Sequence, residues 1–149
     1  MKNNESGRSL IEMLGVLAFG TVLTFSAMKM YQVVRTRQHR FIAEQELQNL
    51  SENARILYTG RRNYSGISKN YLIKAGALKN EKIMNHDFRV ESKSEGENFS
   101  IIFDDLNFGD CAYFSTKPFD WTEEVVVNNI SESPSCLETV PNKLEFIVK

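Results

Sequence analysis

The sequence predicts an α+β fold, in which a long N-terminal helix with a transmembrane first half packs on a small antiparallel β-sheet. The first half of the helix is predicted by an almost unbroken apolar run over residues 10–28. The second half is predicted by apolar residues spaced three or four apart as far as about Tyr58. The sheet is predicted by short alternating segments, separated by turn residues, in the C-terminal half.

The apolar run is long enough to span a bilayer, because its nineteen residues approach the ~20 that a hydrocarbon core of about 30 Å requires. It contains one ionisable residue, Glu12. A carboxylate at mid-membrane costs about 2.5–3.5 kcal/mol, so Glu12 is predicted to be functional and to have a partner. Small residues in the run would let identical helices approach closely, although they also suit an isolated span: Gly15, Ala18, Gly20, Thr21, Ser26 and Ala27.

The chain is therefore divided into a leader at residues 1–7, a transmembrane and assembly helix at 8–28, and a globular domain at 29–149 that includes the amphipathic half of the helix. No proline interrupts the helix before Thr59-Gly60, which mark its end. The residues expected on its buried face are Met30, Val34, Phe41, Ala43, Leu47, Leu50, Ala54 and Leu57.

The segment after the long helix is predicted to form one short helix and several strands. Ser68 is the expected N-cap and Gly76 the expected C-cap of the short helix. Its core-facing residues are expected to be Tyr71, Leu72, Ala75 and Leu78. The expected strands are Phe88–Glu91, Phe99–Phe103, Ala112–Ser115, Val125–Val127 and Leu144–Val148, with a turn at Ser94–Asn98 between the first two.

A short polar leader ends abruptly at Gly7-Arg8, and Glu12 is the fifth residue after Gly7. This arrangement resembles the processing site of type IV pilins and of the related pseudopilins of type II secretion. The resemblance implies that prepilin peptidase cleaves after Gly7 and that the freed amine of Arg8 pairs with Glu12 of a neighbouring subunit. Methylation of that amine, known in the family, stays open. The alternative is a plain signal anchor that carries an incidental Glu12.

The resemblance implies a structural subunit of a type IV pilus-like filament, with a role in secretion or cell adhesion. The implied partners are identical or related pilin subunits, prepilin peptidase, an inner-membrane assembly platform and the membrane. The chain is expected to cross the inner membrane once before assembly, with its C-terminal domain periplasmic, and afterwards to lie in an extracellular filament or a periplasmic pseudopilus. A minor pilin, a pseudopilin and a single-pass anchored periplasmic binding module are the alternatives.

The two cysteines, Cys111 and Cys136, are expected to form a disulfide, because an exported domain with a small core gains most from such a link. Many type IV pilins have a comparable C-terminal disulfide, which supports the expectation. Free thiols are the alternative for a cytosolic domain. Basic residues argue for that side of the membrane, since they are more numerous after the apolar run than before it. The cysteines and the processing motif favour the periplasm.

No enzyme motif is found, and no cofactor or metal is expected. His39 and His86 lack metal-ligand spacing, and nucleic acid is an unlikely partner because Arg61, Arg62 and Tyr64 alone are weak evidence. Charge is uneven: residues 29–62 contain seven Lys/Arg and three Asp/Glu, whereas residues 104–149 contain three and nine. These regions either attract each other between subunits or are two solvated surfaces.

Overall fold

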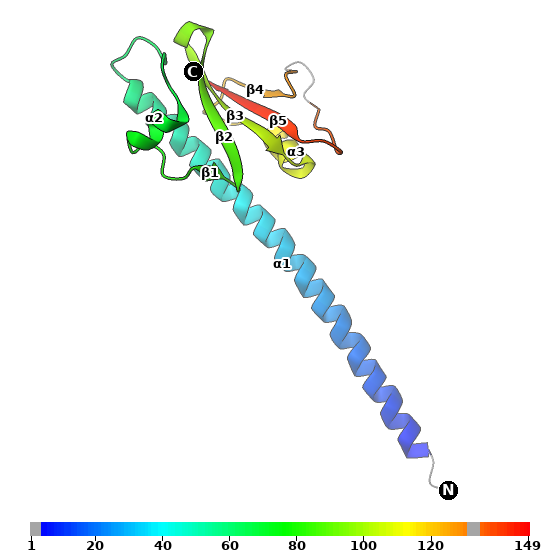
Figure 1. Ribbon diagram of the computed structural model, residues 1–149. Coiled ribbons are helices and arrows are strands. Elements are labelled where there is room, and N and C mark those ends of the chain that lie inside the picture. Colours follow the sequence, from blue (N-terminus) through cyan, green and yellow to red (C-terminus); the bar gives the residue numbers. More distant parts are fainter. Residues whose placement is uncertain (1–3, 131–134) are drawn as a thin grey trace. The chain divides into compact units, whose positions relative to one another are not determined.

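The computed structural model describes residues 4–130 and 135–149, with side chains from Ser9 onward. The chain divides into two compact units, Met1–His39 and Arg40–Lys149, which are described in turn. Helix α1 (Asn4–Tyr58) supplies all of the described part of unit one (Figure 1). Of the described helices it alone is long and apolar enough to span a membrane. Its 18-residue apolar stretch has a mean hydropathy of 1.8, and none of that stretch is buried by the rest of the chain.

The predicted end of the long helix is confirmed, since α1 ends at Tyr58. The amides of Thr59 and Arg61 donate to the carbonyls of Ile56 and Tyr58, which closes the last turn. Gly60 follows with φ +134°, a conformation that a residue with a side chain rarely adopts. The chain therefore leaves the helix at this glycine.

Unit two is an α+β domain in which the Arg40–Tyr58 part of α1 packs on a five-stranded antiparallel sheet, as the sequence predicts (Figure 1). The strand order is β1-β2-β3-β5-β4, so β1 and β4 are the two edge strands. The strands are β1 (Lys82–Ile83), β2 (His86–Lys93), β3 (Asn98–Leu106), β4 (Glu124–Val127) and β5 (Asn142–Val148). The remaining elements are α2 (Lys69–Lys74), the 3₁₀ turn η1 (Ser94–Gly96) and α3 (Phe108–Thr116).

The core lies between α1 and the sheet. From α1 it takes Ala43, Leu47, Leu50, Ser51, Ala54 and Tyr58, and from the sheet mainly Phe88, Val90, Phe99, Ile101, Phe103, Leu144, Phe146 and Val148. The predicted face is wrong at its start, because Met30, Val34 and Phe41 are exposed. At about 100° per residue, Phe41 is turned by roughly 200° from Ala43 and so points away from the sheet.

Helix α2 forms where it was predicted. The Ser68 hydroxyl accepts a hydrogen bond from the Tyr71 amide at 3.2 Å, which confirms the N-cap. The C-cap is Ala75, and Gly76 is the following residue with φ +75°, so the predicted cap was one position late. Leu72 is buried as expected, whereas Ala75 is exposed.

The expected strand at Ala112–Ser115 is wrong, because this segment lies in helix α3. Asn107 caps the helix by accepting a hydrogen bond from the Asp110 amide at 2.9 Å. The two fully buried residues of α3, Cys111 and Phe114, are three positions apart, which is helical spacing. Strand β1 was not predicted, since two residues are too short to show a pattern.

Candidate functional site

The predicted processing junction lies near the start of α1. The helix begins at Asn4, so Gly7 and Arg8 lie in its first turns and Glu12 one turn further on. The side chain of Arg8 is outside the described side chains. Glu12 is on the exposed surface of α1. The roles of these three residues therefore stay predictions.

The apolar part of α1 exposes large side chains on every side. Every residue from Ser9 to His39 is exposed, and Phe19 and Val16 reach 75% and 73%. Contiguous apolar surfaces larger than several hundred Å² mark membrane or protein contacts in soluble proteins. Unit one thus requires lipid or other protein chains to cover it, which fits the expectation of a membrane-anchored helix.

The hydroxyl groups of this segment are satisfied within the helix. Thr21 donates to the Ala18 carbonyl at 2.8 Å, Thr24 to Gly20 at 2.7 Å, and Ser26 to Val22 at 2.8 Å. A polar group without a partner costs several kcal/mol in hydrocarbon. These three residues can therefore enter lipid or a dry helix bundle without leaving an unsatisfied hydrogen-bond donor.

A shallow hollow of about 500 Å³ runs along one side of the same segment. Its lining residues are Val16, Leu17, Gly20, Thr21, Thr24, Phe25 and Met28. A Cβ added at Gly15 or Gly20 would meet nothing within 4 Å. Packing within the chain therefore does not require glycine at either position, whereas close approach of a second helix would use the space.

The predicted disulfide is present in unit two. It joins Cys111 of α3 to Cys136, with 6.0 Å between the Cα atoms. Cys111 is fully buried, so one end of the link is fixed in the core. The link ties the segment before β5 to α3.

Asn142, at the start of β5, holds the same segment by hydrogen bonds and was not found by sequence reasoning. Its Oδ1 accepts from the Leu137 amide at 2.7 Å and from Asn128 Nδ2 at 3.0 Å. Its Nδ2 donates to the Leu137 carbonyl at 2.9 Å and, at 3.4 Å, to the carbonyls of Leu106 and Val140. The side chain is fully buried, so it replaces water as the partner of these groups.

Helix α3 is anchored to α1 through charged groups. Arg40 Nε lies 2.9 Å from Asp110 Oδ1, and the Arg40 guanidinium lies 4.9 Å from the centre of the Tyr113 ring. Glu44 accepts hydrogen bonds from the Tyr113 hydroxyl and the Lys117 ammonium. The Glu44 carboxylate raises the pKa of both Tyr113 and Lys117, because it favours the protonated form of each.

A buried charged residue, Glu145, lies on the face of the sheet that α1 does not cover. Glu145 is only 6% exposed, and its Oε1 lies 2.8 Å from Lys93 Nζ. Burial raises the pKa of Glu145, but the Lys93 ammonium and the Ser100 hydroxyl lower it by more, so the net pKa is below the ordinary value of 4.5. The residue therefore remains ionised at neutral pH.

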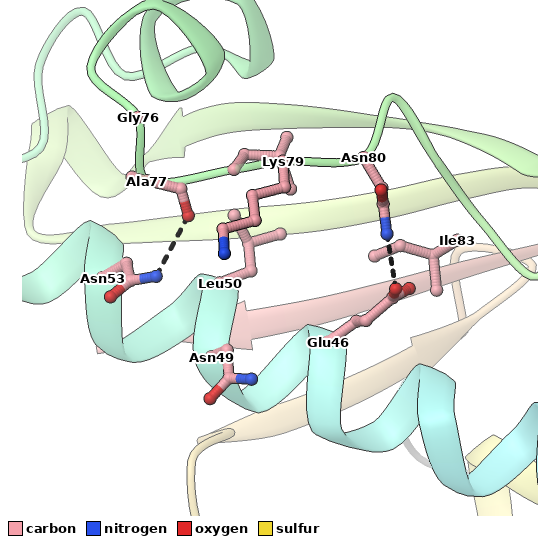
Figure 2. A pocket seen from close by; sticks show the side chains of 10 residues that line it. Glu46, Asn49, Leu50, Asn53, Gly76, Ala77, Lys79, Asn80 and Ile83 are labelled. Carbon is pink, nitrogen blue, oxygen red and sulfur yellow. Dashed lines mark hydrogen bonds between the residues drawn. The ribbon is translucent and has the colours of Figure 1, made fainter.

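A groove of about 260 Å³ lies between α1 and the segment 76–83 (Figure 2). Asn53 Nδ2 donates to the Ala77 carbonyl at 3.0 Å, and Asn80 Nδ2 donates to Glu46 Oε1 at 2.6 Å. These bonds hold the segment against the helix. The side chains of Asn53, Asn80 and Glu46 are therefore used within the fold, and the groove shows no convergent set of reactive groups.

The histidines and the weak basic motif do not converge on a site. Within the described ranges, no three His, Cys, Asp or Glu side chains form a group that would hold a metal ion. Arg61 lies over the rings of Tyr58 and Tyr71, at 4.8 and 5.5 Å, while the ring of Tyr64 packs on Phe99 at 4.9 Å. The aromatic rings near Arg61 thus pack within the fold.

Comparison with known proteins gives no further guide. Searches of protein-family models and of curated protein sequences find no match to this chain.

Proposed function

We propose that this protein is a structural subunit of a type IV pilus-like filament, processed after Gly7 and assembled through the apolar part of α1. The observation that carries the proposal is the fully exposed apolar helix, whose sequence contains a single carboxylate five residues after Gly7. A helix that exposes apolar side chains all round is stable only in lipid or in a bundle of similar helices.

Before assembly, the bilayer covers the apolar helix and holds the subunit in the inner membrane. Cleavage after Gly7 requires the first turn of α1 to open. This opening costs little, because helix ends fray. The new amine of Arg8 then carries a positive charge at the start of the apolar segment. Pairing with Glu12 of the next subunit neutralises both charges in a medium where an isolated charge is expensive.

The same contact fixes how subunits add to one another. The amine of one subunit and the carboxylate of the next are different patches, so the contact is heterologous. A heterologous contact whose rotation does not close builds a helical fibre. The disulfide-linked domain of unit two supports export, because such a link persists in an oxidising compartment.

The proposal is tested by mass spectrometry of the intact protein from cells that contain prepilin peptidase. The expected N-terminus is Arg8, with or without a methyl group. In the same cells, Glu12→Ala is expected to prevent incorporation into filaments, whereas Glu52→Ala, which removes an exposed carboxylate of α1 in unit two, is expected to leave incorporation intact. A chain that begins at Met1 and is indifferent to Glu12→Ala would instead support an anchored binding module.

A further inference from the structure

Unit two carries opposite charges at its two sheet edges. Residues 59–93 contain eight Lys/Arg and three Asp/Glu, whereas residues 94–141 contain one and ten. The strand order puts β1 and β4 at opposite edges, and helix α2 packs on β2 while α3 packs against β4 and β5 (Figure 1). The basic and acidic stretches of the sequence therefore lie at opposite edges of the sheet in the folded domain.

The basic edge is the segment that carries α2 and β1. It exposes five basic side chains, and none of them has an ion-pair partner in the part of the chain that the structure describes: Arg61, Arg62, Lys74, Lys79 and Lys82. The segment 61–82 contains one acidic residue, Glu81. The neighbouring Lys69 differs, because it is paired with Asp87. Lys82 lies opposite Asp87 in the β1–β2 pairing, but that single carboxylate is already shared with Lys69, so the edge keeps a net positive charge.

The acidic edge is formed by the turn before β4 and by the first residue of that strand. Asp120, Glu123 and Glu124 are exposed, and the described residues offer no ion-pair partner to any of them. Glu123 accepts one hydrogen bond, from Asn98 Nδ2 at 3.0 Å. The nearby Lys117 forms an ion pair with Glu44 instead. Arg55 is nearby but donates to the carbonyls of Trp121 and Lys149, so no ion pair among the described residues neutralises these three carboxylates.

We propose that the basic edge of one subunit docks on the acidic edge of the next copy of the same chain. The inference rests on the proposed filament function and names a lateral contact that the apolar helix does not supply. The proposed partner is a second copy of the chain, because one edge has cations without ion-pair partners and the other has carboxylates without them. Since the two edges are different surfaces, the contact is heterologous and continues along a fibre.

Exposed ion pairs contribute little individually, and salt screens them over about 8 Å at physiological ionic strength. Their main effect is on choice of partner and orientation, because like charges brought together are strongly disfavoured. The edge contact is therefore expected to determine how neighbouring subunits are oriented, while the apolar helices bury most of the surface between subunits.

A zero-length carbodiimide tests the contact, because it joins an amine only to a carboxylate in direct contact. It is applied to the full-length protein in membranes or filaments from cells that express it. The expected products are intermolecular links from Lys74, Lys79 or Lys82 to Asp120, Glu123 or Glu124, identified by peptide mass spectrometry. Links that join other regions only, in filaments that still form, would overturn the edge contact.

Charge-reversal variants sharpen the test. Lys79→Glu/Lys82→Glu and Glu123→Lys/Glu124→Lys are each expected to lower the filament yield by at least about tenfold, and the four changes in one chain are expected to restore the yield. Asp105→Lys/Glu138→Lys changes the net charge by the same amount as Glu123→Lys/Glu124→Lys, at exposed positions near Asn142 and so at the other end of the sheet from Glu123 and Glu124, and is the matched control. No restoration, or an equal loss in the control, would overturn the inference.

The outcome for the edges is distinguishable from the outcome for the filament. Normal cleavage and dependence on Glu12, with charge reversal at either edge harmless, would leave the filament function standing and remove the edge contact. Edge links in a chain that is neither cleaved nor sensitive to Glu12→Ala would keep the contact and remove the filament function.

Discussion

Replacing Asn142 by Ala is expected to destabilise unit two by about 3 kcal/mol. Two strong hydrogen bonds, with the Leu137 amide at 2.7 Å and its carbonyl at 2.9 Å, are lost at about 1 kcal/mol each. The Leu106 carbonyl, which faces the fully buried side chain, loses a donor and adds about 1 kcal/mol. The segment before β5 would then be held mainly by the disulfide.

The assay is urea unfolding of the full-length protein in detergent, followed by the fluorescence of Trp121. This is the only tryptophan of the chain, and it is 7% exposed, with its ring 5.3 Å from that of Phe146. The matched control is Asn70→Ala, at an exposed position of α2, for which a change within about 0.5 kcal/mol is expected. Equal effects of the two substitutions would refute the role given to Asn142.

Three further outcomes are expected in the same unfolding assay. Cys111→Ser/Cys136→Ser is expected to lose roughly 3–4 kcal/mol, and reductant to produce this loss in the wild type but not in the variant. The wild type is expected to lose stability as the pH falls below about 4.5, because the pKa of Glu145 is lower in the folded protein than in the unfolded chain and the ionised carboxylate is the form that stabilises the fold. Glu145→Gln is expected to show a smaller loss of stability over the same pH range. Leu47→Ala, at a fully buried position, is expected to cost about 3 kcal/mol, and Phe41→Ala, at an exposed one, less than about 0.5 kcal/mol.

The sequence predicts those elements of the fold that depend on neighbouring residues alone, such as hydropathy, helix caps and the absence of proline. The unbroken helix to Tyr58 follows from hydropathy and the absence of proline, and Ser68 identifies the start of α2. The signal failed at residues 112–115, where aromatic residues favour a strand but the Asn107 cap and the burial of Phe114 stabilise a helix. Tertiary packing decides between the two there.

The candidate site residues were predicted unevenly, for a physical reason. The disulfide between Cys111 and Cys136 needs only a count of cysteines and an exported domain. Asn142 and Glu145 were missed because their importance depends on which groups the fold brings to them. An asparagine and a glutamate near a strand are ordinary in sequence, and only burial makes them costly to change.

The two units differ in where their burial comes from, and this determines what each experiment reports. Unit two buries its own core between α1 and the sheet, so its unfolding, followed by Trp121, depends on contacts within one chain. Unit one exposes every described side chain from Ser9 to His39, so lipid, detergent or other copies have to cover its apolar residues. A substitution in the apolar run, such as Glu12→Ala, is therefore expected to change association without changing the unfolding of unit two. Loss of filaments in such a variant with unchanged Trp121 unfolding would assign the effect to assembly, whereas a parallel loss of stability would assign it to the fold.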